Sequence, residues 1–279
     1  MSAATTLRGL LATGATLVMP DAYDPLSARI IAQLGFAAVQ CSGFSMAASR
    51  LCAEAAFGFE RNLATTAAIV QAVAIPVMAD GEDGFGGVSV IGETVRAYAE
   101  AGVAGINLED QVLGVPGRRQ IIPLDEAVAK LQAAREAAAR AGVPDLVING
   151  RTDALPAGDT PETGLAEAIG RANAYLQAGA DLAFIVGVDD LAQVHTLVRE
   201  ISGPISIAAG MPNNLDKFSV AQLRDAGVAR VSLPSLLIFS AIRAMTRSLQ
   251  SVQRTDGFAE IIGEDRVCGM GDLMQLLAR

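Results

Sequence analysis

The chain has 279 residues, of which 51% are hydrophobic and 18% are charged, so it can build a core and does not have the composition of a disordered protein. Its net charge is −9 and its lysines and arginines form no long run, which argues against nucleic-acid binding. The length fits one α/β barrel, a fold that typically needs roughly 250 residues.

Cysteine usage and the first residues indicate a reducing compartment. Cys41, Cys52 and Cys268 form no CxxC pair, so we expect a cytoplasmic location. Segment 1–20 is apolar in part, but it has no clear cleavage site and runs into a strand-like sequence, so a secretion signal is the less favoured alternative. No apolar run is long enough to suggest a membrane span, and we expect no membrane partner.

Short apolar runs alternate with longer amphipathic stretches along the chain. The amphipathic stretches often end in Ala-Gly or Leu-Gly, which is typical of helix ends. The apolar runs are each followed by Gly, Asp, Ser or Pro, as expected of buried parallel strands. The predicted strands are 16–20, 37–43, 76–83, 104–110, 145–153, 181–187, 205–210 and 230–235.

Eight such units predict an α/β fold, a (β/α)8 TIM-type barrel with extra C-terminal helices. An open doubly wound sheet is the alternative, and it is disfavoured because no GxGxxG motif opens the first helix. We expect one domain over 1–279, with a helical extension from about residue 236. The apolar face of this extension needs a cover, which is either a second copy of the chain or its own barrel.

Acidic residues follow the third and fourth predicted strands, where barrel active sites lie. Asp80 and Glu82 alternate along an extended backbone, so they are expected to share a face, and Glu109 ends the neighbouring strand. Three carboxylates at one barrel mouth repel each other unless a cation is present, and oxygen ligands suit Mg²⁺. The sequence therefore predicts a Mg²⁺ site here. The alternative is that such acids cap the following helices.

Arg151 ends the fifth predicted strand, where a guanidinium needs an anionic partner. Its planar fork suits a substrate carboxylate, and the alternative is a structural ion pair with Asp153. His195, the single histidine, lies in a helical stretch and is expected outside the barrel. A Ser/His/Asp triad is therefore not predicted.

Several segments resemble, in order, the isocitrate lyase and phosphoenolpyruvate mutase superfamily. They are MPDAYDPLSARIIAQLGFAAV with CSGFS, PVMADGEDGFGG, AGVAGINLEDQV, NGRTDAL and AYLQAGADLAFIVG. The resemblance implies a barrel enzyme that cleaves or rearranges C–C or C–P bonds, with the substrate held at Mg²⁺ and an enolate-like pyruvate species as intermediate. It also implies a homo-oligomer, a dimer or tetramer, in which C-terminal helices are often exchanged.

The resemblance assigns two groups of residues to the barrel mouth. The substrate, a small carboxylic acid, would be bound by Tyr23, Ser42, Gly43, Phe44, Asp80 and Arg151. The Mg²⁺ shell would consist of Asp80, Glu82 and Glu109, with Glu82 in place of a more usual Asp.

The loop after Glu109 departs from the family pattern. Lyases of the family carry Lys-Lys/Arg-Cys-Gly-His there, and the cysteine serves as general acid or base. The corresponding stretch, VLGVPGRRQIIPLDE, has no Cys, His or Lys. Arg118 and Arg119 are predicted to close over an anionic substrate as a catalytic lid, and the alternative is a solvated basic turn.

These observations favour a Mg²⁺-dependent lyase acting on a small 2-oxo or dicarboxylic acid, by oxaloacetate-type decarboxylation or retro-aldol cleavage. The predicted catalytic residues are Arg151, Glu109, Arg118 and Arg119. Decarboxylation needs the least machinery, because Mg²⁺ and an arginine stabilise the enolate that remains. One alternative is a C–P bond mutase or hydrolase acting on phosphonopyruvate, and another is a non-catalytic oxo-acid-binding protein.

Overall fold

Eight parallel strands close into a barrel in the computed structural model, which describes residues 2–278. In chain order, which is also their order around the barrel, they are β1 (Leu17–Ala22), β2 (Val39–Cys41), β3 (Val77–Asp80), β4 (Gly105–Glu109), β5 (Val147–Thr152), β6 (Leu182–Ile185), β7 (Ile205–Ala208) and β8 (Arg230–Leu233). β1 pairs with both β2 and β8, so the sheet has no free edge. All eight predicted strands are present, and the TIM-type barrel is confirmed.

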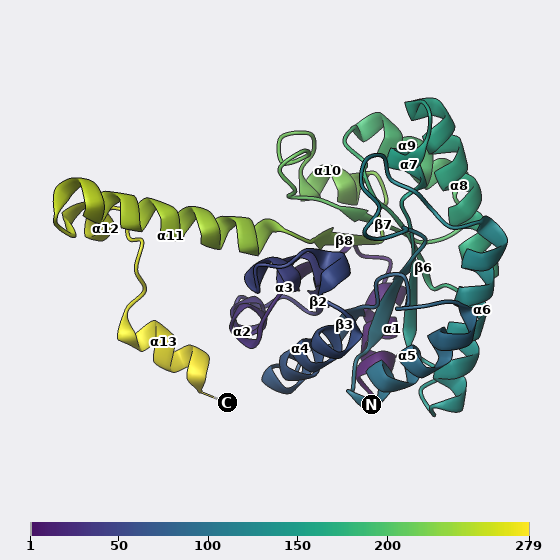
Figure 1. Ribbon diagram of the computed structural model, residues 1–279, viewed down its shortest axis with the longest axis horizontal. Coiled ribbons are helices and arrows are strands. Elements are labelled where there is room, and N and C mark those ends of the chain that lie inside the picture. The colour runs from purple at the N-terminus through teal and green to yellow at the C-terminus, as the bar shows by residue number, and fades with distance from the viewer. Residues whose placement is uncertain (1, 279) are drawn as a thin grey trace.

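Helices follow the strands and form the outer layer of the barrel (Figure 1). They are α1 (Ala3–Ala12), α2 (Pro25–Gln33), α3 (Gly43–Ser49), the 3-10 helix η1 (Glu54–Ala56), α4 (Phe59–Ala72), α5 (Val88–Glu100), α6 (Leu124–Arg140), α7 (Ala154–Ala157), α8 (Pro161–Gln177), α9 (Leu191–Glu200), α10 (Val220–Asp225), α11 (Leu236–Thr255), α12 (Ala259–Gly263) and α13 (Met270–Leu277). Asp24 and Thr160 begin α2 and α8 with reciprocal side-chain caps, and a proline follows each cap. Local sequence therefore fixes where these two helices start.

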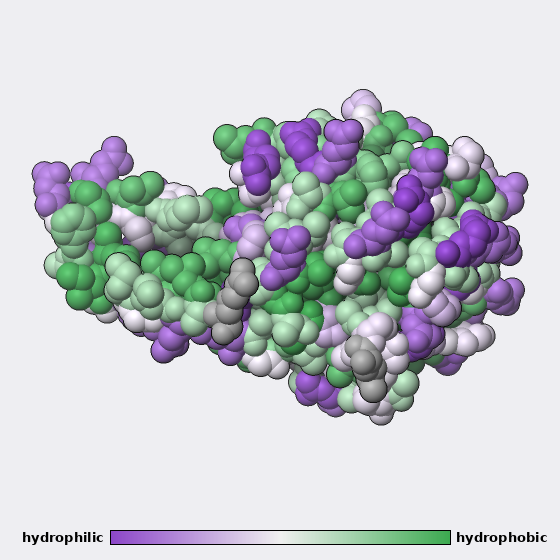
Figure 2. Space-filling view, turned by 90° about the horizontal axis from the view of Figure 1, so that it is seen from below, coloured by the Kyte–Doolittle hydropathy of each residue, from purple (hydrophilic) through white to green (hydrophobic). Residues whose placement is uncertain are grey.

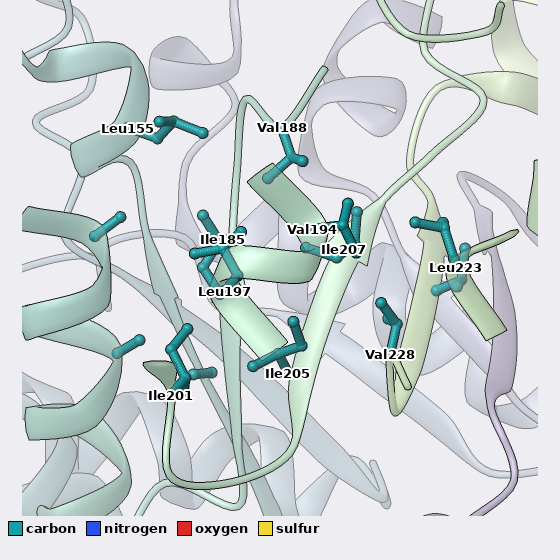
Figure 3. Packing of buried hydrophobic residues seen from close by; sticks show 14 of the residues in the cluster. Leu155, Ile185, Val188, Val194, Leu197, Ile201, Ile205, Ile207, Leu223 and Val228 are labelled. Atoms are coloured by element: carbon teal, nitrogen blue, oxygen red, sulfur yellow. The ribbon is translucent and has the colours of Figure 1, made fainter. Parts of the chain in front are cut away.

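Apolar side chains fill the layer between strands and helices. In the region shown in Figure 3, Ile185 of β6 and Ile207 of β7 pack with Val194, Leu197 and Ile201, which recur at helical spacing in and just after α9. Full burial of a side chain of this size contributes about 1.5–3 kcal/mol. The alternation read from the sequence therefore corresponds to the packing of each helix on its strand.

Helix α1 covers the N-terminal end of the barrel. Its Leu7 is fully buried and clusters with the first residues of three strands, Leu17, Val147 and Leu182. Segment 1–20, weighed above as a secretion signal, thus contributes this helix and most of β1 to the fold. Within residues 2–278, no helix combines the length and apolar character needed to cross a membrane.

The barrel interior above α1 is polar. TIM barrels are usually filled by branched aliphatic side chains. Here Gln40, Asn107, Asn149, Ser206 and Arg230 are all buried along the strands. The amide of Asn149 donates to Asn107 Oδ1 at 2.6 Å. Hydrogen-bonding groups therefore lie directly beneath the mouth of the barrel.

The C-terminal helices form an arm that extends away from the barrel (Figure 1). α11 begins at Leu236, and α13 returns to α2, where Arg29 Nη1 donates to the carbonyl of Ala278 at 2.6 Å. Figure 2 shows apolar surface along this arm. Its exposed apolar residues are Phe239, Ile242, Met245, Leu249, Phe258, Ile262, Val267, Met270, Leu273, Met274 and Leu277. The expectation of one domain over 1–279 stays a prediction.

Candidate active site

Three carboxylates from two separate parts of the chain surround Gly43. Its N–H donates to Asp80 Oδ2 at 2.8 Å. A Cβ atom at this position would lie 3.0 Å from Glu82 Oε1, 3.2 Å from Asp80 Oδ2 and 3.3 Å from Glu54 Oε1. A side chain at this position would require these carboxylates to move by a few tenths of an ångström. Glu109 lies at the end of β4, the neighbour of the strand that carries Asp80. Glu54, Asp80, Glu82 and Glu109 are called the carboxylate cluster below.

Glu82 reaches the cluster through a turn. β3 ends at Asp80, and Glu82 has a φ of 47°, in the left-handed region. The two acids lie on the same side, as expected, but the extended backbone predicted between them is wrong, because a turn brings Glu82 there. Asn62 Nδ2 donates to Glu82 Oε1 at 3.0 Å, and the N–H of Glu109 donates to the Glu82 carbonyl at 2.9 Å. Such backbone strain concentrates at functional sites.

Burial and mutual repulsion raise the pKa values of the cluster. Desolvation, followed by the charges of Asp80 and Glu54, raises the pKa of Glu82 to about 9. Desolvation raises the pKa of Glu109 to about 8, although Arg151 opposes the shift. Burial and Asp80 also raise the pKa of Glu54. A cation bound by Glu82 or Glu109 would favour the ionised form of that ligand and release its proton.

Arg151 connects the cluster to the segment that follows β5. Its Nη1 lies 2.5 Å from Glu109 Oε2, and its Nε lies 2.8 Å from Asp153 Oδ2. Its Nη2 donates to Gln111 Oε1 at 3.2 Å. The ion pair with Asp153, given above as the alternative for this residue, is present. Three partners therefore hold the guanidinium in one orientation at the barrel mouth.

The loop after β4 folds into a hairpin closed by an antiparallel bridge. Arg119 pairs with the buried carboxylate of Asp153, which also holds Arg151. Arg118 instead pairs with Asp159 at 2.5 Å, and both of these side chains are mostly exposed. Arg119 is thus joined to the site through Asp153, whereas Arg118 faces the surface.

The remaining predicted substrate residues lie around the mouth with other partners. Ser42 Oγ caps α3, donating to Ser45 Oγ at 3.0 Å and accepting from the Ser45 N–H at 3.1 Å. The ring of Phe44 is 44% exposed and lies 6.1 Å from that of Phe239 on the arm. Tyr23 packs half-buried against an apolar cluster around β2 and α2. Their assignment to substrate binding stays a prediction.

The predicted site residues therefore divide into two sets. Those that the structure brings together are Gly43, Asp80, Glu82, Glu109, Arg151 and, through Asp153, Arg119. The side chains that lie apart from this group are those of Tyr23, Ser42, Phe44 and Arg118, although the backbone N–H of Phe44 donates to Glu54. His195 is exposed on α9, as expected.

Glu54 is a site residue that the sequence reasoning missed. It belongs to η1, which follows α3, and reasoning from the ends of strands passes over such a segment. The backbone N–H of Phe44 donates to its carboxylate, and Asp80 and Arg151 are among the charges that act on it. The available signal was an acidic residue in ASRLCAEAAFGFE, the segment that closely follows the predicted substrate residues Ser42, Gly43 and Phe44.

The cluster has the chemistry of a Mg²⁺ site. It presents several carboxylate oxygens, the ligand type that Mg²⁺ prefers, and their pKa values are raised by desolvation first and by their mutual repulsion second. Across residues 2–278, no three His, Cys, Asp or Glu side chains are arranged to hold one ion together. A bound Mg²⁺ would therefore take one or two carboxylates and complete its shell with water and substrate oxygens, as this ion commonly does. The ligand set Asp80, Glu82 and Glu109 stays a prediction.

Known proteins resemble this chain over most of its length. 2,3-Dimethylmalate lyase of Eubacterium barkeri is 32% identical over 94% of this chain and 90% of its own length. Oxaloacetate decarboxylase of Pseudomonas putida is 33% identical over 85% of this chain and 80% of its own. A solved structure of phosphonopyruvate hydrolase, in complex with oxalate and Mg²⁺, matches with a TM-score of 0.87 and 26% identity over 99% of this chain and 95% of that one.

These matches confirm the predicted enzyme class, a carbon–carbon lyase of the isocitrate lyase and phosphoenolpyruvate mutase superfamily. The model of the phosphoenolpyruvate phosphomutase family matches residues 7–253. The barrel, the acidic mouth and the extent of this match show that the chain belongs to the phosphoenolpyruvate phosphomutase family.

Proposed function

We propose that the protein is a Mg²⁺-dependent lyase that decarboxylates oxaloacetate or a closely related 2-oxo dicarboxylic acid. The observation that carries this proposal is the composition of loop 111–122, which has two arginines and no side chain that exchanges a proton near neutral pH. Loss of CO₂ from a carboxylate that lies β to the oxo group, as in oxaloacetate, needs a stabilised enolate but no base on this loop. The similarity to an oxaloacetate decarboxylase supports the same reaction.

Arg151 is the residue that stabilises charge in this reaction. As the C–C bond breaks, its electron pair passes to the oxo group and CO₂ leaves. A guanidinium already fixed by Glu109, Asp153 and Gln111 meets the developing oxyanion without reorganising. Removing one such donor typically lowers kcat by about 10²–10³. Mg²⁺, held by Asp80 with Glu82 or Glu109, would supply Lewis-acid polarisation of the oxo group.

Glu54 is the candidate proton donor in this scheme. Burial raises its pKa, which favours the protonated acid. Transfer of its proton to the methylene carbon of the enolate gives pyruvate from oxaloacetate and leaves a carboxylate, which solvent reprotonates. Glu54→Gln should therefore slow pyruvate formation while leaving affinity for oxalate, which needs no proton, close to that of the wild type.

Hydrolysis or rearrangement of phosphonopyruvate is the second candidate. The match to phosphonopyruvate hydrolase favours it, since that protein holds oxalate and Mg²⁺ on the same fold. The same Arg151 could stabilise the enolate formed when a C–P bond breaks. Hydrolysis releases inorganic phosphate and rearrangement gives phosphoenolpyruvate, whereas decarboxylation releases CO₂.

A lactate dehydrogenase-coupled assay tests the proposal. Oxaloacetate, dimethylmalate, methylisocitrate and phosphonopyruvate would each be supplied with Mg²⁺ or with EDTA, and inorganic phosphate would be measured in parallel. We expect oxaloacetate to give pyruvate in the Mg²⁺ arm only, above the uncatalysed rate. Release of phosphate, or formation of phosphoenolpyruvate detected by adding pyruvate kinase and ADP, would favour the second candidate. Oxalate binding without any product would favour a non-catalytic oxo-acid-binding protein.

We further propose that the arm is covered by a second copy of the chain in a homo-oligomer, and that the protein acts in the cytoplasm. The exposed apolar residues of α11 to α13 support the first proposal, because an apolar surface of this extent favours association. The three free cysteines support the second. Light scattering after size exclusion should give a dimer or tetramer, and a monomer would contradict this proposal.

A further inference from the structure

A buried arginine lies inside the barrel among neutral partners. Arg230 begins β8 and is fully buried. Its Nη2 donates to Gln40 Oε1 at 2.6 Å, its Nη1 to Ser206 Oγ at 2.8 Å, and its Nε to Met19 Sδ at 3.2 Å. Its guanidinium carbon lies 5.7 Å from the ring centroid of Phe184. Within residues 2–278 it forms no ion pair with a carboxylate, in contrast to Arg151 at the mouth.

A charge held in this way does not favour folding. Transfer of a guanidinium from water into the interior costs several kcal/mol, and neutral acceptors recover only part of that cost. Burial lowers the pKa of Arg230 to about 10, while the charges of Asp21 and Asp80 act in the opposite direction. The acids that act on Arg230 thus include Asp80, a member of the carboxylate cluster.

Hydrogen bonds connect Arg230 to the turn that carries Gly43. Gln40, which accepts from Arg230, donates through Nε2 to the carbonyl of Cys41 at 2.7 Å. Two residues later, the N–H of Gly43 donates to Asp80. The charge of Arg230 acts on Asp80, and its hydrogen bonds reach the segment whose Gly43 N–H binds the same carboxylate.

We propose that Arg230 is a positioning residue that sets the charge balance of the site, holding the end of β2 in place and weakening the affinity of the carboxylate cluster for a divalent cation. The inference rests on the proposed function, because it takes the cluster as the cation site. A positive charge beneath the site opposes a divalent ion and favours an anionic substrate. The interior screens this interaction weakly, so its loss changes cation affinity on the order of tenfold to a hundredfold.

Asp21 provides a second change of opposite sign. Its Oδ1 accepts from Ser232 Oγ at 2.9 Å and from the N–H of Leu233 at 3.0 Å, so asparagine can keep both bonds. Asp21→Asn removes a negative charge that offsets Arg230. The proposal therefore requires Asp21→Asn to weaken cation binding, whereas loss of the positive charge in Arg230→Met strengthens it.

Titration with Mn²⁺ tests these opposite effects, and electron paramagnetic resonance measures the free ion. The titration of the full chain is made at about pH 8.5, which is above the pKa of Asp21, so that this acid carries its charge. We expect Arg230→Met to bind Mn²⁺ at least about tenfold more tightly than the wild type, and Asp21→Asn to bind it several-fold more weakly. Arg230→Lys keeps the charge and should stay within about threefold of the wild type. Circular dichroism verifies that each variant is folded.

The outcomes separate this inference from the proposed function. The role of Arg230 would be overturned if Arg230→Met bound Mn²⁺ no more tightly than the wild type, or if the Met and Lys variants bound it equally. Either result would leave the assignment of the cation site unaffected. A wild type that binds no Mn²⁺, with or without oxalate, would overturn the proposed function and this inference together. If Arg230→Met does not fold, an affinity in Asp21→Asn that is equal to or tighter than that of the wild type contradicts the proposal.

Discussion

Replacing Arg151 with methionine should destabilise the protein in a pH-dependent way. Arg151 contacts Glu109 and Asp153, whose side chains are 3% and 0% exposed. Asp153 keeps Arg119 as a partner, so Glu109 is the acid left without a counter-charge. Removing one member of a buried ion pair typically costs about 3–5 kcal/mol. We expect a loss near the lower end of this range, because the carboxyl can respond by taking up a proton.

The sign of the pH effect follows from Glu109. The pKa of Glu109 is raised from 4.5 to about 8 in the folded protein. Between pH 4.5 and about pH 8 the folded protein therefore binds more protons than the unfolded chain, and its stability falls as pH rises through this window. Arg151→Met raises this pKa further. As pH rises, the ion pair compensates more of the charge on Glu109 in the wild type, whereas the variant must keep the acid protonated or leave its charge unpaired, so the variant should lose more stability at about pH 9 than at about pH 7.

Activity should fall together with stability. Loss of a fixed donor at the developing oxyanion should lower kcat/KM for oxaloacetate by about 10²–10³. Arg151→Lys is the matched control, since it keeps the charge but loses the fork, and it should lie between the wild type and the methionine variant. Urea unfolding at the two pH values and the coupled assay give the two readouts. A methionine variant with kcat/KM within about threefold of the wild type, or with a loss of stability independent of pH, would refute the reasoning.

Three further predictions follow from other contacts. Gly43→Ala would place a Cβ atom 3.0 Å from a carboxylate oxygen of the cluster. Mg²⁺-dependent turnover should therefore fall about tenfold or more, while the protein loses less than about 2 kcal/mol of stability. Turnover equal to that of the wild type would contradict the close contact between Gly43 and the cluster. Arg119→Ala should lower kcat/KM about tenfold more than Arg118→Ala, because only Arg119 binds Asp153, the buried acid that holds Arg151. Steady-state kinetics of the two variants test this difference. Burial raises the pKa of Asp21 from 3.8 to about 7, so the wild type should lose stability as pH rises through this window. Asparagine cannot ionise, so the stability of Asp21→Asn should fall by up to a few kcal/mol less over the same window. Thermal unfolding of both proteins at several pH values tests this, and an equal dependence of stability on pH in the two proteins would contradict the prediction.

The barrel was predictable because its strands are continuous apolar runs whose ends carry Gly, Asp or Ser. Predicted strand boundaries failed where backbone conformation, rather than hydropathy, ends the strand. The run 76–83 was expected to stay extended, but the backbone turns at Glu82 after β3 ends at Asp80. A left-handed non-glycine residue leaves no mark in the hydropathy pattern.

The predicted site was most accurate where residues lie at strand ends. Asp80, Glu109 and Arg151 meet at the mouth because the carboxyl ends of parallel strands meet there. Glu54 comes from a short helix between strands, and only the folded chain brings it beside Gly43. Arg230 begins a predicted strand, and its burial among neutral partners depends on which way that strand faces in the closed barrel.

A crystal structure of the protein with oxalate and Mn²⁺ tests the assignment of the active site most directly. Anomalous scattering locates the ion without reference to the activity of the protein. We expect one ion in the carboxylate cluster, bound to Asp80 directly or through water, with oxalate between the ion and Arg151. An ion and oxalate bound away from the cluster, or oxalate bound without an ion at saturating Mn²⁺, would contradict the assignment.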